Sequence, residues 1–206
     1  MRSPTSVKAL EEFGRVRLSD SFFMRDFLHS DIAAIHGIPN VPEDPDLAIA
    51  SGSALCQQLL EPLQLKFGRI SIRSSFRAAA VNHYGNVNKL NCASNEANYA
   101  GHIWDRRDSE GRMGATACIV INRLVPYYER TGDWEAIAWW IHDYLPYSDM
   151  EFFPKLAAFN LQWREDPVRR IYSYTPPRRG LLTKPGMDNW AGRHDQAYAQ
   201  MLEEIG

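Results

Sequence analysis

One stretch decides the fold class, residues 45–73: PDLAIASGSALCQQLLEPLQLKFGRISIR. Its apolar residues recur at intervals of three and four, which is typical of an amphipathic helix, and Pro45 suits a first helical turn. We therefore predict one long helix from Pro45 to Phe67, kinked near Pro62, which lacks the N–H that a helix interior needs. Gly68 ends this helix, and the alternation of polar and apolar residues over Arg69 to Arg73 predicts a short strand.

Upstream of this stretch we expect two shorter helices. One opens at Ser19-Asp20 and runs through Phe27, and the other runs from Ser30-Asp31 to Gly37, because Ser and Asp are favoured helix N-caps and Gly is favoured at the C-terminal end. The N-terminal segment Met1 to Glu12 mixes charges with single apolar residues and lacks the apolar centre of a secretory signal. We therefore expect a cytoplasmic protein.

Downstream, helices give way to strands. The expected elements are a strand at Ala117–Ile121, helical residues up to Arg130, a helix at Trp134–Tyr144, three strands at Met150–Phe153, Ala157–Trp163 and Arg170–Tyr174, an irregular tail over Pro176–Gly192 and a last helix at His194–Glu204. Helices thus dominate the first third and strands the last third. This order predicts an α+β fold, with an antiparallel sheet and helices packed on one face.

Composition restricts the classes of partner. The chain has 206 residues, 45% of them hydrophobic, which is enough for one good core, so we predict a single domain over 1–206. A net charge of −2 offers no electrostatic reason for binding nucleic acid, and no apolar run approaches the roughly 20 residues that span a bilayer. Three cysteines without CxxC spacing predict neither a disulfide framework nor a cysteine-based zinc site.

Four segments resemble one known family. The predicted strand is followed by Ser74-Ser75-Phe76-Arg77 and then Asn82, and residues 96–105 match the spacing of a Ser-x-His-x-x-Gly-x-Ala-x-Asp motif at Gly101 and Asp105. This pattern resembles the zinc D-alanyl-D-alanine carboxypeptidases, whose family includes D,D-dipeptidases of vancomycin resistance, phage endolysin peptidases and the hedgehog signalling domain. The resemblance covers roughly Leu18 to Tyr174, with 175–206 as a C-terminal extension.

The resemblance implies a site that has lost most of its metal ligands. Asp105 matches the metal-binding aspartate, whereas Asn98 stands at the first zinc histidine and Glu96 at the motif's serine. On the late strand, Asn160 stands at the second histidine and Ala157 at the catalytic acid. Asparagine offers zinc only a neutral oxygen, and without the acid no group activates water, so we expect no cofactor and no classical zinc hydrolysis.

Two histidines keep zinc open as an alternative. If the true metal ligands differ from those of this alignment, His102 or His83 would be recruited to bind zinc. We keep His102, with Asp105, as a candidate metal ligand. Strand alternation from Asp105 argues against His102, because it points that side chain outward. His142, near the end of a predicted helix, is expected to be a packed or capping side chain.

Arg77 is the best-preserved part of the implied site. In the family the matching arginine lies beside the active site, and a guanidinium can clamp a carboxylate, although a structural ion pair is an equal alternative. We take Arg77 and Asp105 as candidate catalytic residues and Asn98, Asn160, Glu96 and His83 as candidate ligand-binding residues. The polar segment Asn91–Tyr99 either forms a hydrogen-bonding pocket with Asn160 or is a turn-rich connector.

The sequence leaves three functions open. The first is a divergent member of the peptidase fold that binds a peptide or cell-wall-like ligand in the old active-site cleft without zinc hydrolysis. The second is an active metallopeptidase or endolysin-type hydrolase of peptidoglycan peptides with non-standard ligands. The third is a structural or interaction module of a larger assembly, with a protein partner. Whether the chain is an enzyme is left open, because a fold does not fix a function.

Overall fold

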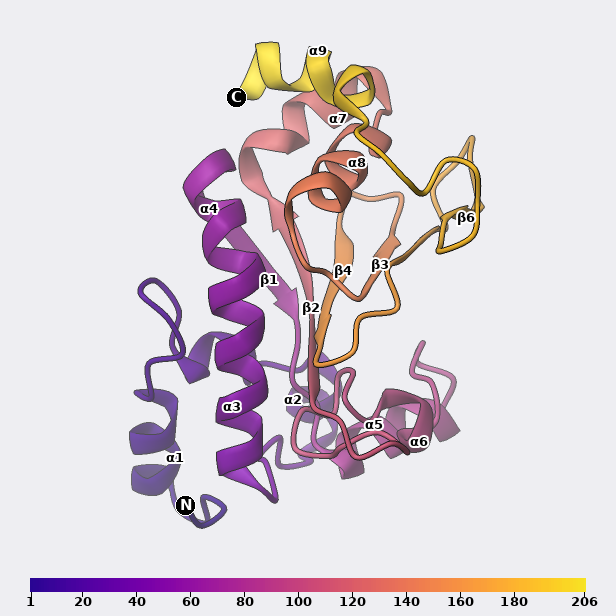
Figure 1. Ribbon diagram of the computed structural model, residues 1–206. Coiled ribbons are helices and arrows are strands. Elements are labelled where there is room, and N and C mark those ends of the chain that lie inside the picture. The colour runs from indigo at the N-terminus through magenta and orange to yellow at the C-terminus, as the bar shows by residue number, and fades with distance from the viewer. The chain divides into compact units, whose positions relative to one another are not determined.

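The computed structural model describes all residues from Met1 to Gly206 and has the mixed α+β composition expected from the sequence (Figure 1). The chain divides into two compact units. The first consists of Met1–Gln57 and Ser74–Ala117, and the second of Gln58–Arg73 and Cys118–Gly206. None of the helices is long and apolar enough to cross a membrane.

The helices of the first unit are short apart from one. They are α1 (Val7–Gly14), the 3-10 turn η1 (Met24–Phe27), α2 (Asp31–His36), α3 (Pro45–Leu55), α5 (Ala79–Val87) and α6 (Asn95–Asn98). Helix α2 has the predicted ends, since the Ser30 hydroxyl accepts from the backbone N–H of Ala33 and Gly37 adopts the left-handed conformation at φ 64°.

The predicted helix from Ser19 to Phe27 is wrong except for its last four residues. The backbone N–H of Leu18 donates to the carbonyl of Phe22 at 2.9 Å, which closes a turn where the helix was expected to begin. The Arg17 side chain binds the carbonyls of Ser19 and Asp20, so these carbonyls are satisfied without a helix. Helix α1, capped by the Ser6 hydroxyl, was not anticipated.

The long helix is present but has a local irregularity at its middle. Helix α3 passes through a π-helical segment at Cys56–Leu60 into α4 (Glu61–Phe67), which ends at Gly68 as predicted. Pro62, two residues after the π segment, has no N–H to donate to the preceding turn. The helix irregularity expected at Pro62 therefore takes the form of a π-helical segment just before the proline.

Trp104 forms the centre of the first unit's core. Its side chain is fully buried, and its ring lies 5.3 Å from Phe27 and 6.2 Å from Phe76 between centroids. Helix α3 approaches it at Gly52, where an added Cβ would lie only 2.6 Å from the Trp104 ring. A glycine is therefore required at this position for α3 to pack against the indole.

The second unit holds most of a six-stranded sheet in the order β1-β2-β4-β3-β5-β6. The strands are β1 (Ile70–Ser74), β2 (Gly114–Ile121), β3 (Asp149–Phe152), β4 (Phe159–Arg164), β5 (Arg170–Ser173) and β6 (Gly180–Thr183). Pairs β3–β4 and β5–β6 are antiparallel, but β3–β5 is parallel, which departs from a fully antiparallel sheet. After the β3–β4 hairpin the chain crosses to the free side of β3, so β5 runs with β3.

Helices η3 (Asn122–Leu124), α7 (Val125–Thr131), α8 (Glu135–Tyr144) and α9 (Asp195–Ile205) complete the second unit. Aromatic residues fill its core: the rings of Phe67 and Trp140 meet edge-on at 4.7 Å, and those of Trp134 and Phe152 lie 4.8 Å apart. Helix α9 packs on α7 and α8 (Figure 1). Strand β6 lies within the segment that was expected to be irregular.

Candidate functional site

The first unit brings Arg77 and His102 together through their backbones. The N–H of Arg77 donates to the carbonyl of His102 at 2.8 Å, and His102 Nδ1 donates to the carbonyl of Ser75 at 2.7 Å. His102 is buried, so the expectation that it points outward is wrong. Residues around it form turns and not a regular strand, and the alternation argument therefore does not apply.

Asp105 is a buried carboxylate with an incomplete set of hydrogen bonds. Its side chain is nearly inaccessible, Oδ2 accepts from the backbone N–H of Glu43 at 2.7 Å, and Oδ1 has no hydrogen-bond partner. Burial raises the pKa of Asp105 above its ordinary value, although the Glu43 N–H and the charge of Arg106 act in the opposite direction.

The Arg77 side chain reaches the polar segment before α6. Its guanidinium Nη1 lies 2.6 Å from Cys92 Sγ, and the side chain is half-buried. The segment is fastened to α5 by asparagines: Asn82 donates to the Ala93 carbonyl at 3.0 Å and to Asn95 Oδ1 at 2.9 Å. Asn98 in turn donates to Asn82 Oδ1 at 2.9 Å, so the amides form a connected chain.

Glu96 and His83 lie at the exposed side of this polar cluster. Glu96 is in the first turn of α6, and its pKa is lowered by its own backbone N–H, by the Ser94 hydroxyl and by the charge of His83. His83 projects from α5 and is exposed. Five predicted residues of the first unit, with Asn82, therefore occupy neighbouring segments: Arg77, His83, Glu96, Asn98 and His102.

Asn160 belongs to the second unit, where it lies on a polar face of the sheet. In the strand register it is opposite Glu151, whose carboxylate accepts from its amide at 3.0 Å. Arg170 forms an ion pair with Asp149 at 2.5 Å and lies 3.9 Å from Glu151. Burial raises the pKa of Asp149 to about 6, because desolvation of the carboxylate outweighs the attraction of Arg170.

The donor groups of the first unit do not fit a catalytic zinc. Zinc sites use three strong nitrogen, sulfur or carboxylate donors, but here one carboxylate is accompanied by a neutral amide. The amide nitrogen of Asn98 is already held by Asn82, and His102 Nδ1 is held by the Ser75 carbonyl. Asp105 Oδ1 has no hydrogen-bond partner, but Asp105 belongs to no group of three His, Cys, Asp or Glu side chains that could hold a metal ion.

A second group of side chains, not predicted as a site, lies in the second unit. His142, Asp143 and His194 each offer a ligand atom, and these atoms lie within 4.8 Å of one another, so the group could hold a metal ion. His142 and Asp143 lie in the last turn of helix α8, and His194 directly precedes α9. His142 is buried, as a packed side chain was expected to be, and burial lowers its pKa.

Asp143 is the anchor of this group. Its side chain is fully buried, Oδ1 lies 2.7 Å from His194 Nδ1, and Oδ2 accepts from the His194 backbone N–H at 2.7 Å and from the Tyr198 hydroxyl at 3.0 Å. Burial alone would raise its pKa, but these donors outweigh burial and hold the pKa below its ordinary value. The His194 ring also stacks on Trp139, 4.1 Å away.

No protein-family model, curated protein or solved structure matches this chain significantly.

The resemblance to the D,D-carboxypeptidases is therefore carried by the quoted motif residues alone. The His142–Asp143–His194 group has no sequence motif either, because about 50 residues separate its two halves. The only sequence signal was a His-Asp pair at the end of a helix and a histidine before the last helix. The His-Asp pair and the later histidine do not have the spacing of a known metal-binding motif.

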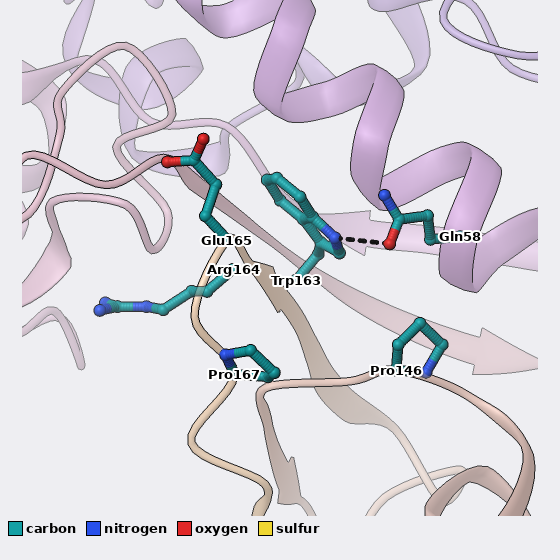
Figure 2. Close-up of a pocket in the computed structure, with 6 residues that line it drawn as sticks. All are labelled: Gln58, Pro146, Trp163, Arg164, Glu165 and Pro167. Atoms are coloured by element: carbon teal, nitrogen blue, oxygen red, sulfur yellow. Dashed lines mark hydrogen bonds between the residues drawn. The ribbon is translucent and has the colours of Figure 1, made fainter.

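The second unit also has a surface groove (Figure 2). It has a volume of about 510 Å³ and is lined by Gln58, Pro146, Trp163, Arg164, Glu165 and Pro167. The Trp163 indole is largely buried, and its N–H donates to the Gln58 side-chain oxygen at 2.9 Å (Figure 2).

Proposed function

We propose that this protein binds a peptide or cell-wall-like ligand through the ligand's carboxylate, with Arg77 as the receiving cation and without classical zinc hydrolysis. The proposal follows the resemblance to the D,D-carboxypeptidase family in its ligand class and departs from it in chemistry. It places the first unit's polar cluster, and not a metal, at the centre of recognition.

The observation that carries the proposal is the chain of side-chain amides beside Arg77. Asn98, at the position of a zinc histidine, donates to Asn82, and Asn82 donates to Asn95 and to the backbone before α6. Amides that are fixed by one another form a rigid, neutral hydrogen-bonding wall and not a set of metal donors. Such a wall next to a guanidinium suits a ligand that combines peptide groups with a carboxylate.

Arg77 is well placed for this role because its backbone is fixed. Its N–H is bonded to His102, and the following residue, Ala78, donates its own N–H to Asn40 Oδ1 at 2.7 Å. A guanidinium carries five N–H donors in a planar fork, the geometry that a carboxylate matches in a bidentate pair. Preorganisation of this kind reduces the entropy lost when a ligand binds.

The test uses a pair of peptides that differ only in charge. Calorimetry would compare a peptide ending in D-Ala-D-Ala, with a free carboxylate, with its C-terminal amide, on the chelator-treated full chain. We expect the acid to bind at least about tenfold more tightly, since hydrogen bonds to charged groups are worth about 1.5 to 3 kcal/mol. Arg77→Met should abolish this preference, whereas Arg73→Met, at an exposed arginine, should preserve it.

Three results would count against the proposal. Equal binding of acid and amide would remove the role of the carboxylate. Absence of binding to a folded protein would remove the ligand class. Release of free D-alanine from the peptide would favour the alternative, an active hydrolase whose ligands differ from those of the alignment.

A further inference from the structure

His194 and Asp143 face each other across a short contact of 2.7 Å. His194 Nε2 lies 3.0 Å from the carbonyl oxygen of Asn189, and a carbonyl only accepts, so Nε2 carries a hydrogen. The other ring nitrogen, Nδ1, lies 2.7 Å from the Asp143 carboxylate. This ring nitrogen and the carboxylate oxygen are both ligand types that zinc uses, and they face one another from two different segments of the chain.

The other contacts of His194 and Asp143 hold both side chains in place. The arrangement on the far side of the ring is the one that metal-ligating histidines use, in which the second nitrogen donates to a backbone carbonyl and fixes the tautomer. The carboxylate is oriented as well, since Oδ2 is held by the Tyr198 hydroxyl and the His194 N–H. Both groups are therefore positioned by outer contacts before any ion binds.

His142 supplies a third donor. Its Nδ1 lies 2.7 Å from the Tyr147 hydroxyl, which can accept as well as donate, and its Nε2 lies 2.9 Å from the carbonyl of Trp190. The ligand atoms of His142, Asp143 and His194 all lie within 4.8 Å of one another. Zinc bonds of about 2.0 to 2.2 Å need a closer set, so His142 must release the Trp190 carbonyl and approach the other two.

A cavity beside the three residues gives access. It has a volume of about 280 Å³ and is lined by His142, Asp143, Arg169, Trp190, Ala191 and Gly192. The Trp190 indole nitrogen is buried and has no hydrogen-bond partner, which is costly for a donor in the interior. A donor left unsatisfied at the wall of a cavity indicates that an acceptor binds there.

We propose that His142, Asp143 and His194 bind a divalent transition metal of the zinc class, with a water molecule or an anion in the remaining position. Two imidazoles and one carboxylate are the donor set of open zinc sites, which use three protein ligands and leave the fourth place to a small molecule. That fourth ligand accepts from the Trp190 indole, which explains the orphaned donor. The guanidinium of Arg169 at the same cavity favours an anion there.

The site fastens the segment before α9 to helix α8. Arg193, whose Nε lies 3.8 Å from Asp143 Oδ2, and Arg169 add positive charge that the metal must overcome. The fully buried Asp143 carboxylate counters this charge locally. The inference is independent of the ligand proposed for Arg77, since it concerns residues of the other unit only.

The test titrates the chelator-stripped full chain with Zn²⁺ and, separately, with Co²⁺. We expect one metal per chain, a visible cobalt spectrum of tetrahedral type and a higher melting temperature with zinc. His142→Gln and His194→Gln should each weaken zinc binding by at least about 100-fold, because even outer-shell partners contribute about 10- to 100-fold. His29→Gln, at an exposed histidine of the first unit, is the matched control and should bind as the wild type does.

Histidine ¹⁵N chemical shifts of the wild-type chain provide a readout that needs no variant. Addition of zinc should move the ring resonances of His142 and His194 and leave those of the exposed His29 in place. Lack of zinc binding by the folded wild type would overturn the proposal, as would unchanged affinity in both glutamine variants. Loss of zinc binding in Asp105→Asn with retention in His194→Gln would overturn it too, and would return the metal to the first unit.

Discussion

Removal of the Asp149 charge is the sharpest test of the electrostatics. Asp149 lies on strand β3 with 20% of its side chain exposed, and it pairs with Arg170 on β5. Its pKa is raised to about 6, first by burial and then by the neighbouring Glu151, while Arg170 opposes the rise. In the unfolded chain the group returns to its ordinary value of 3.8.

The sign follows from proton linkage. A carboxyl group whose pKa is higher in the folded state favours folding when it is protonated, so its contribution is complete below pH 4 and is lost as the pH rises through 6. About two pKa units separate the folded and unfolded values, and each corresponds to about 1.4 kcal/mol, so about 3 kcal/mol of unfolding free energy should be lost.

Urea unfolding of the wild type and of Asp149→Asn between pH 3.5 and 7.5 measures this effect. The wild type should lose about 3 kcal/mol relative to the variant as the pH rises, because the amide does not titrate. Asp188→Asn, at an exposed aspartate of the same unit, controls for the charge change itself. If the wild type gains stability relative to Asp149→Asn over this range, attraction by Arg170 outweighs burial and the reasoning is refuted.

Three further substitutions test packing and hydrogen bonding by chemical denaturation. Gly52→Ala should cost about 1 to 3 kcal/mol despite alanine's helix propensity, because its Cβ would lie 2.6 Å from Trp104; an unchanged midpoint would mean that the indole moves freely. Asn82→Ala removes a buried side chain that both donates and accepts hydrogen bonds, and should lower the unfolding free energy by about 2 kcal/mol or more. An unchanged unfolding free energy would show that water replaces the lost hydrogen bonds. Ser30→Ala should cost about 1 kcal/mol through its lost cap on α2, whereas Ser30→Gly should cost only a few tenths.

Local signals in the sequence predicted the elements whose ends are set by single residues. Ser30 and Gly37 bound α2, Gly68 ends α4, and the alternation over residues 69–73 corresponds to β1. These features depend on contacts within one turn of chain, which a sequence displays directly. The α+β class followed from the same elements.

Other features depend on partners far away in the sequence. The turn at Leu18 replaced a helix because Phe22 and Arg17 satisfy its backbone, and β6 forms only by pairing with β5. His102 proved buried because its segment forms turns around Trp104. The group of His142, Asp143 and His194 could not be predicted, because strands β3 to β6 lie between its two histidines in the sequence.

The division of the chain has a consequence for its synthesis on the ribosome. The first unit is complete in sequence once residue 117 has been made, although residues 58–73 within that stretch belong to the second unit. Helix α4 and strand β1 must therefore wait, after emerging, for partners that are translated later, from Cys118 onwards. Because domains tend to fold as they emerge, the nascent chain holds the apolar face of α4, with Leu63 and Phe67, unsatisfied during that interval. A chaperone that binds apolar segments would therefore act mainly during this interval.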